Sequence, residues 1–230
     1  TFTVPLSKFY DVIDTERLLP DDLASYQSYI EERHRKMIAL TFDDGPDPTT
    51  TPQALAILKK YNAKATFFMV GKNVSANPDI AKRVRKEGHQ IGNHTWDHPQ
   101  LPKLSLDNAK KEILDTQEAI QKATGVQTKI TRPPYGAINN AIQYSVDQSF
   151  IMWDVDSLDW KTHNTTAILN EVKKEVKPGS IILMHDIHQT TIDALPTVLD
   201  YLKSQGYTFV TVDELLDYQL ESHRIYYNGN

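Results

Sequence analysis

The segment that decides the fold is MIALTFDDGP, at residues 37–46. Residues 37–42 are mostly apolar, which predicts a buried β-strand, and Gly45-Pro46 predicts a sharp turn after the acidic pair Asp43-Asp44. Loops that follow the strands of a parallel α/β sheet or barrel converge on one face, where side chains distant in sequence meet. A buried strand that ends in two carboxylates therefore predicts a polar site on that face.

The remainder of the chain repeats this pattern. From Met37 onward, short β-rich segments alternate with helical periodicity, which is typical of βα units around a parallel sheet. Helix-start signals such as Asn77-Pro78, and glycines before strands such as Gly88, support the alternation. We expect a closed or nearly closed α/β barrel. The predicted strands cover residues 37–42, 65–70, 89–92, 129–132, 150–154, 180–185 and 208–212.

The length of 230 residues suits one large α/β domain. Residues before about position 31 are polar, aromatic and poorly periodic. We therefore predict an N-terminal extension, or the tail of an upstream domain, over residues 1–36. One folded domain is predicted over residues 37–230.

Composition narrows the classes of partner and chemistry. Acidic residues outnumber basic ones, 30 to 25, and no basic stripe with interleaved aromatic residues occurs, so we expect no nucleic-acid partner. The absence of cysteine excludes disulfides, thiolate metal sites and thiol nucleophiles. No apolar segment has membrane-spanning length, so we expect no membrane contact from this chain, and we expect a monomer.

Two clusters supply metal-binding residue types. Adjacent residues at a strand end point in different directions, so one of Asp43 and Asp44 could bind a metal while the other faces a water. His94 and His98 lie in one loop before Pro99, and two histidines with one carboxylate form a common catalytic zinc ligand set. The alternatives are a turn with solvated acids and a pair of surface histidines.

A third cluster, Arg132-Pro133-Pro134-Tyr135, follows a predicted strand and begins a rigid loop. A backbone N–H fixed near Tyr135 could bind a developing oxyanion. Arg132 could keep a nearby carboxylate ionised through a charge-assisted hydrogen bond. The alternative is a surface arginine on a turn stiffened by proline.

Two further clusters follow the strands predicted at 150–154 and 180–185. Asp156, Asp159 and Trp160 place an aromatic face among acids, which suits packing against a sugar ring. His185 closes a buried strand and titrates in the range of a general acid, and Leu183 on the same side could line an apolar pocket. The alternatives are packing tryptophans and a core histidine. All five clusters fall at strand ends, and together they indicate a mononuclear metal hydrolase.

These clusters resemble the motifs of the polysaccharide deacetylases, the carbohydrate esterase family 4 that shares the NodB homology domain. The matching segments are TFDDG at 41–45, HTWDH at 94–98, RPPY at 132–135, DSLDW at 156–160 and LMH at 183–185. The resemblance extends from about residue 37 to about residue 216. It implies a distorted (β/α) barrel with seven or eight parallel strands, and a catalytic domain that removes acetyl groups from a polysaccharide.

The resemblance also implies a role for each motif residue. A divalent metal, zinc or else cobalt or another divalent ion, would be bound by Asp44, His94 and His98. The residues implied to act in catalysis or substrate binding are Asp43 as base, His185 as acid, Arg132 orienting Asp43, Asp159 tuning His185 or pairing with Arg132, the Tyr135 N–H holding the oxyanion, and Trp160 with Leu183 as substrate wall and acetyl pocket.

Residues 132–138 and 151–160 are particularly similar to streptococcus-type peptidoglycan N-acetylglucosamine deacetylases. The implied substrate is N-acetylglucosamine in peptidoglycan, and the implied location is the cell envelope or exterior of a Gram-positive bacterium. Alternatives are the same chemistry on chitin oligosaccharide, poly-N-acetylglucosamine or O-acetylated xylan, and a non-catalytic glycan-binding relic. A metal phosphohydrolase is disfavoured because no phosphate-binding glycine loop accompanies the acids.

Overall fold

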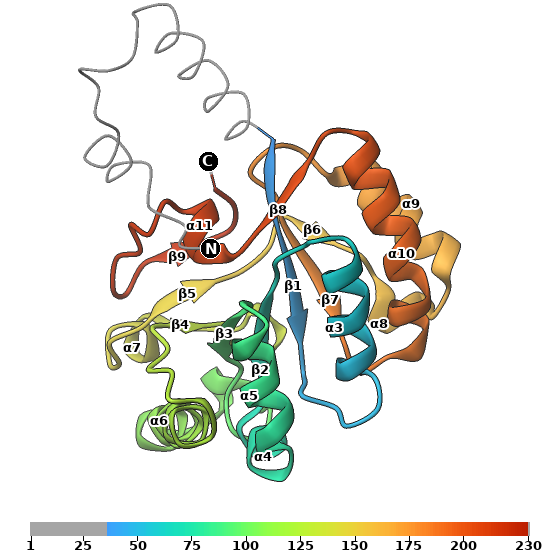
Figure 1. The fold of residues 1–230 in the computed structure, drawn as a ribbon. Coiled ribbons are helices and arrows are strands. Elements are labelled where there is room, and N and C mark those ends of the chain that lie inside the picture. The colour runs from blue at the N-terminus through green and yellow to red at the C-terminus, as the bar shows by residue number, and fades with distance from the viewer. Residues whose placement is uncertain (1–35, 230) are drawn as a thin grey trace, which may run out of the picture.

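A computed structural model describes residues 36–229 of the chain. A curled parallel β-sheet lies at the centre, and helices pack around its outside (Figure 1). This is the α/β, distorted-barrel fold class that the sequence predicts. The extension predicted over residues 1–36 lies outside the described residues, except for Lys36.

The described residues form nine strands. Their order in the sheet is β6-β7-β1-β2-β3-β4-β5-β9, with β8 paired to β1, and all the strand pairings are parallel. The strands are β1 (Met37–Asp43), β2 (Thr66–Met69), β3 (Gln90–Asn93), β4 (Ile130–Thr131), β5 (Ser149–Ile151), β6 (Val155–Asp156), β7 (Ile181–His185), β8 (Thr208–Val210) and β9 (Ile225–Tyr226).

Strand β1 organises the sheet because it pairs with three other strands. Its first residues pair with β8, and its last residues pair with β2 on one side and β7 on the other. The register with β7 places Asp43 opposite His185. Two residues of the predicted site, far apart in sequence, are thus neighbours at one end of the barrel.

One predicted strand, residues 150–154, is wrong in detail, because the chain there forms β5, a break and then β6. At the break the Asp154 carboxylate Oδ1 accepts a hydrogen bond of 2.8 Å from the Ile181 N–H, in the place of a backbone carbonyl. Strand β6 is one end of the sheet order and β5 lies next to the other end strand, β9, so this single segment connects the two sides of the curled sheet. The sequence prediction also missed β9, which is only two residues long.

The helices lie between the strands and cover the outside of the sheet, with α9 and α10 beside β7 and with α4, α5 and α6 on the other flank (Figure 1). The helices are α3 (Thr51–Lys60), α4 (Gly71–Ala76), α5 (Pro78–Lys86), α6 (Leu106–Thr124), α7 (Asn140–Gln143), α8 (Asp159–Thr162), α9 (Thr165–Glu175), α10 (Gln189–Ser204) and α11 (Val212–Leu215), with 3₁₀ turns η2 (Leu101–Lys103) and η3 (Pro134–Gly136). Among the described residues, none of these helices combines the length and apolar character needed to cross a membrane.

Three apolar clusters hold the sheet in place, of which the two largest cover its two faces. Outward-facing residues such as Phe42 and Phe67, whose rings stack at 5.1 Å, pack with the outer helices. Inward-facing residues such as Phe68 and Ile151 fill the barrel. Complete burial of one such side chain stabilises the fold by about 1.5–3 kcal/mol, so the strand ends are held on a rigid support.

Candidate active site

The five sequence clusters converge at the carboxyl ends of the strands. Each of the ten residues assigned from the motifs lies in the last three residues of a strand or in the segment directly after it. The structure thereby brings together segments separated by up to about 140 positions, as parallel α/β folds do at their active faces. The roles of the individual residues depend on the geometry that follows.

Asp44, His94 and His98 form a group whose ligand atoms lie within 4.8 Å of one another. Asp44 Oδ1 is 3.4 Å from Nε2 of His94 and 3.4 Å from Nε2 of His98. This oxygen is buried and has no hydrogen-bond partner among the described residues. An unpaired buried carboxylate oxygen that faces two imidazole nitrogens fits a divalent cation, and the donor set is one that zinc and similar metals prefer.

The backbone fixes Asp44 in this position. Its φ of 76° is left-handed, and the Asn73 side chain donates a hydrogen bond of 2.8 Å to its carbonyl oxygen. Burial tends to raise the pKa of Asp44, but the hydrogen bond and charge of His94, together with the charges of His185 and His98, outweigh burial and lower the pKa to about 2. The carboxylate is therefore ionised, as a metal ligand must be.

The orientation of His94 leaves the correct nitrogen for a metal. Nδ1 lies 2.6 Å from the Arg132 carbonyl oxygen, so Nδ1 carries the proton and Nε2 has the lone pair. His98 has a left-handed φ of 58°, and its ring packs at 4.8 Å against the ring of Tyr135. Residues 94–99 form no helix, in agreement with the loop that the sequence predicts for this histidine pair.

Arg132 is fully buried, so the alternative of a surface arginine is wrong. Its Nη1 donates to Asp43 Oδ1 at 2.8 Å and to the Thr41 hydroxyl at 2.7 Å. Nε and Nη2 donate to the carbonyls of Ile151 and Met152 at 3.0 and 2.8 Å. The Asp43 carboxylate is therefore held by one oxygen, and its other oxygen, Oδ2, faces His94 Nε2 at 3.5 Å on the side of the metal-binding group.

His185 is paired with Asp159, which is fully buried at the start of α8. Asp159 Oδ1 lies 2.8 Å from His185 Nδ1, and Oδ2 accepts from the His185 N–H at 2.7 Å and the Thr191 hydroxyl at 2.7 Å. Burial lowers the pKa of His185, but the hydrogen bond and charge of Asp159 outweigh burial and raise the pKa to about 9. Of the two partners that the sequence left open for Asp159, the structure selects His185.

The residues assigned to substrate contact differ in exposure. Trp160 is 49% exposed, and its indole N–H donates to Asp156 Oδ2 at 3.4 Å. Leu183 is only 4% exposed and lies opposite Asp156 in the pairing of β6 with β7. Tyr135 is 69% exposed, with a left-handed φ of 61°. Its N–H takes no part in the two backbone hydrogen bonds that close the η3 turn.

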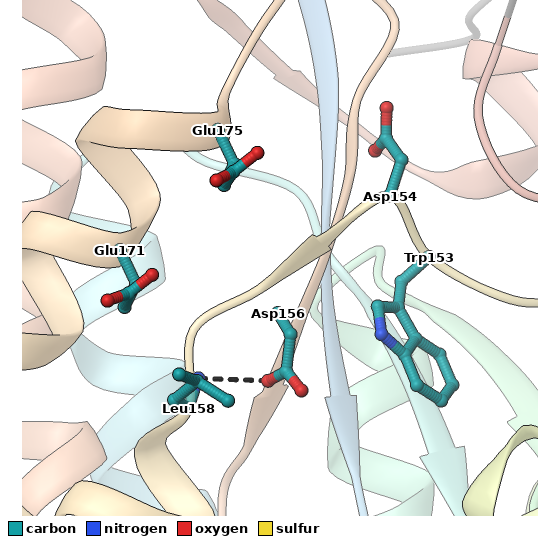
Figure 2. Close-up of a pocket in the computed structure, with 6 residues that line it drawn as sticks. All are labelled: Trp153, Asp154, Asp156, Leu158, Glu171 and Glu175. Carbon is teal, nitrogen blue, oxygen red and sulfur yellow. Dashed lines mark hydrogen bonds between the residues drawn. The ribbon is translucent and has the colours of Figure 1, made fainter.

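A hollow of about 310 Å³ lies beside β6 and α9. Figure 2 shows Glu171 and Glu175 on one side of it and Trp153 on the other, with Asp156 bonded to the Leu158 N–H. Asp156 belongs both to this hollow and to the hydrogen bond that orients Trp160. The hollow is lined by Trp153, Asp154, Asp156, Leu158, Glu171 and Glu175.

Sequence reasoning missed three polar residues of the site. The Thr41 hydroxyl accepts a hydrogen bond from Arg132 Nη1, which also donates to Asp43. The Thr191 hydroxyl donates a hydrogen bond to Asp159. Asp186 is fully buried, accepts a hydrogen bond from the Thr51 hydroxyl, and lies against Gly45. Of these three residues, only Thr41 could have been found from the sequence, because it lies in the strand predicted at residues 37–42, just before the acidic pair.

The fold and these contacts define a class: a metal-binding α/β barrel in which a carboxylate–arginine pair and a carboxylate–histidine pair flank the metal-binding group. Residues 30–149 match the family described as polysaccharide deacetylase. The chain belongs to this family.

Two curated relatives and two solved structures illustrate the relationship. The chain is 47% identical over 193 residues to the peptidoglycan-N-acetylglucosamine deacetylase PgdA of Listeria monocytogenes, covering 84% of this chain and 41% of the relative. It is 45% identical over 182 residues to the peptidoglycan-N-acetylmuramic acid deacetylase PdaC of Bacillus subtilis, covering 79% and 39%. The chain thus spans about two fifths of the length of these relatives.

Among solved structures, a T48 deacetylase with substrate superposes with a TM-score of 0.81 at 44% identity, over 84% of this chain and 96% of that one. A family 4 acetyl xylan esterase from Clostridium thermocellum, in complex with a cobalt ion, superposes with a TM-score of 0.80 at 36% identity, over 84% and 98%. The predicted family and fold are confirmed, and the metal-binding group is present.

Proposed function

We propose that this chain is a metal-dependent deacetylase that hydrolyses the N-acetyl group of N-acetylglucosamine residues in peptidoglycan. The products are acetate and a glycan with a free amine. One observation carries the proposal: Asp43 and His185 lie opposite each other on β1 and β7, each fixed by its own buried partner, next to a preformed metal-binding group. Relatives with peptidoglycan deacetylase names support the choice of substrate.

The metal would be bound by Asp44, His94 and His98. We propose zinc, with cobalt as an alternative that is supported by the cobalt ion in the acetyl xylan esterase structure. A bound divalent ion would polarise the amide carbonyl and lower the pKa of a water in the site.

Asp43 would act as the base. Arg132 binds one of its oxygens through a charge-assisted hydrogen bond and so fixes the orientation of the carboxylate. The other oxygen is then available to take a proton from the attacking water while the water oxygen bonds to the carbonyl carbon. The Tyr135 N–H would donate to the carbonyl oxygen as negative charge develops there.

His185 would act as the acid. Asp159 fixes the Nδ1 proton, so Nε2–H is the proton that His185 would deliver to the sugar nitrogen as the C–N bond breaks. The raised pKa keeps this imidazole protonated at neutral pH. Water has then supplied its hydroxyl to acetate, Asp43 holds the proton from water, and the amine has gained the proton from His185.

Trp160 and Leu183 would contact the substrate. The exposed indole offers a face for the sugar ring, and its hydrogen bond to Asp156 holds that face in place. The buried Leu183 would border the space for the acetyl methyl group. Other polymers are alternatives, namely chitin oligosaccharide, poly-N-acetylglucosamine and O-acetylated xylan, because flanking contacts rather than the metal-binding group select among them.

We further propose that the chain acts at the cell envelope of a Gram-positive bacterium, on an N-acetylated polysaccharide, as a monomer. The peptidoglycan deacetylases of Listeria and Bacillus support this location. The non-catalytic alternative is disfavoured because both carboxylate pairs and all three metal-binding residues are retained.

Acetate release from purified peptidoglycan tests the proposal, with chito-oligosaccharide in parallel. Chelated enzyme should be inactive, and zinc or cobalt should restore release. Asp43→Asn should lower kcat by about 10²–10⁴-fold, the usual contribution of a general base. Asp147→Asn is a matched control, because Asp147 is an exposed carboxylate paired with Lys129 away from the site. Full activity of Asp43→Asn, or no release from either substrate with metal, would contradict the proposal.

A further inference from the structure

Two histidines outside the motifs lie together at the edge of the active face. His163 ends α8 and His188 precedes α10, and their rings meet at a centroid distance of 5.0 Å and an angle of 84°. His188 also lies 6.0 Å, ring to ring, from His185. The pair therefore stands next to the proposed acid.

The spacing of this pair matches that of the histidines in the metal-binding group. The rings of His94 and His98 are 4.9 Å apart at an angle of 64°. With metal–nitrogen distances of about 2.0–2.1 Å, two imidazoles that share one tetrahedral ion have ring centroids about 5 Å apart. The His163–His188 distance of 5.0 Å meets this requirement.

The backbone holds both histidines in place. The His163 N–H donates to the Asp159 carbonyl at 3.1 Å, and the His188 carbonyl accepts from the N–H groups of Thr191 and Ile192 at 3.1 and 3.2 Å. The Thr191 hydroxyl donates to Asp159 at 2.7 Å and so joins the start of α10 to α8. Because α8 and α10 are joined in this way, the two histidines lose little conformational entropy when they bind an ion.

The ring nitrogens of the pair are available. In residues 36–229, neither imidazole takes part in a side-chain hydrogen bond, whereas His94, His185 and His223 each use Nδ1. Burial lowers the pKa of His188; Asp159 opposes this effect, and the neighbouring His185 and His163 lower the pKa further. A neutral imidazole keeps the lone pair that a metal requires.

We propose that His163 and His188 form a second binding site for a divalent metal. Imidazole ligands select borderline ions, so zinc, copper, nickel or cobalt would bind, with water in the remaining positions. The binding proposal is independent of the proposed function. A consequence does rest on that function: a second cation close to His185 disfavours its protonated form, so excess metal inhibits the enzyme.

Zinc titration of the metal-free protein tests the site without any substrate. By isothermal titration calorimetry, wild type should bind two equivalents, a tight one and a weaker one, and His163→Gln/His188→Gln should lose the weaker one. His223→Gln is the matched control, because His223 is a partly exposed histidine that packs on Tyr144 rather than on another histidine, and it should keep both. A single equivalent in wild type, or two in the double variant, would overturn the proposal.

Activity gives a second readout. At one equivalent of zinc, the double variant and wild type should have the same activity. Excess zinc should inhibit wild type and leave the double variant active. Equal inhibition of both proteins would overturn the inhibitory role. Loss of the weaker equivalent in the double variant, in a protein with no activity on any glycan, would uphold the site and count only against the proposed function.

Discussion

Replacement of Asp159 by asparagine should move the alkaline limit of activity toward neutral pH. Asp159 is buried and accepts hydrogen bonds from both the ring Nδ1 and the backbone N–H of His185. Asparagine has nearly the same shape, and its carbonyl oxygen can still accept from the His185 N–H and the Thr191 hydroxyl. The substitution therefore removes the negative charge while leaving most of the local packing.

The structure gives the size of the effect. The pKa of His185 is raised from 6.5 to about 9, against burial, which lowers it. This difference corresponds to about 3 kcal/mol in favour of the protonated imidazole. Asp43 and Asp44 also contribute, but Asp159 is the largest of the contributions that raise the pKa. Without Asp159 the pKa should fall by about two pH units, because burial then opposes only the weaker effects of the more distant carboxylates.

The sign follows from the proposed role. As an acid, His185 acts only when protonated, so activity is present below its pKa and is lost as the pH rises through it. The measurement is kcat for acetate release against pH, in metal-saturated wild type, Asp159→Asn and Asp156→Asn. Asp156 belongs to the same motif but contacts Leu158 and Trp160 instead of His185, so its variant should keep the wild-type limit.

One result would refute this reasoning. If Asp159→Asn reduces kcat equally at every pH and keeps the wild-type alkaline limit, then Asp159 does not set the protonation of His185. Asp159 would then be only a structural anchor for α8 and α10. A change in the limit of similar size in Asp156→Asn would also refute it, because the effect would no longer follow the contact with His185.

Three other predictions follow from buried groups. Arg132→Met leaves the Asp43 carboxylate buried without its partner and should destabilise the fold by about 3–5 kcal/mol, as measured by urea denaturation; a change below about 1 kcal/mol would contradict the pairing. Burial raises the pKa of Asp186 from 3.8 to about 7, so the metal-free protein should lose at most about 4 kcal/mol of stability as the pH rises from about 4 to 7. The neutral Asp186→Asn should restore the lost stability at pH 8 and add none at pH 4. Equal effects of this variant at both pH values would count against this assignment. Gly45→Ala places a Cβ 2.7 Å from both Asp186 carboxylate oxygens, so the turn must shift and displace the adjacent Asp44. This variant should therefore bind zinc more weakly. Unchanged zinc affinity by calorimetry would show that the turn adjusts without moving Asp44.

The central strand and the site face could be predicted because their signals are local. Residues 37–42 are apolar over a length typical of strands, and an acidic pair with a Gly-Pro turn marks the point where the strand ends. The same combination recurs after other buried strands, so the convergence of the clusters followed from the general rule for parallel sheets. These features need no knowledge of long-range contacts.

The remaining features depend on contacts between distant residues. The break between β5 and β6 arises because the Asp154 carboxylate binds the backbone of Ile181, 27 positions later. The choice of Asp159 between His185 and Arg132 depends on the position of α8 beside β7, which no local pattern encodes. The buried Asp186 is also invisible in sequence, because an acid after a strand normally indicates a solvated turn.

The pairing of β1 with β7 links the two proposed proton-transfer groups. Asp43 and His185 are opposite each other in register, and each is bound by a residue of a different element: Arg132 directly follows β4, and Asp159 begins α8. The guanidinium holds the carboxylate through a charge-assisted hydrogen bond, and the anion next to the imidazole favours its protonated form. The fold therefore places a carboxylate held by a cation next to an imidazole held by an anion, at the ends of two paired strands.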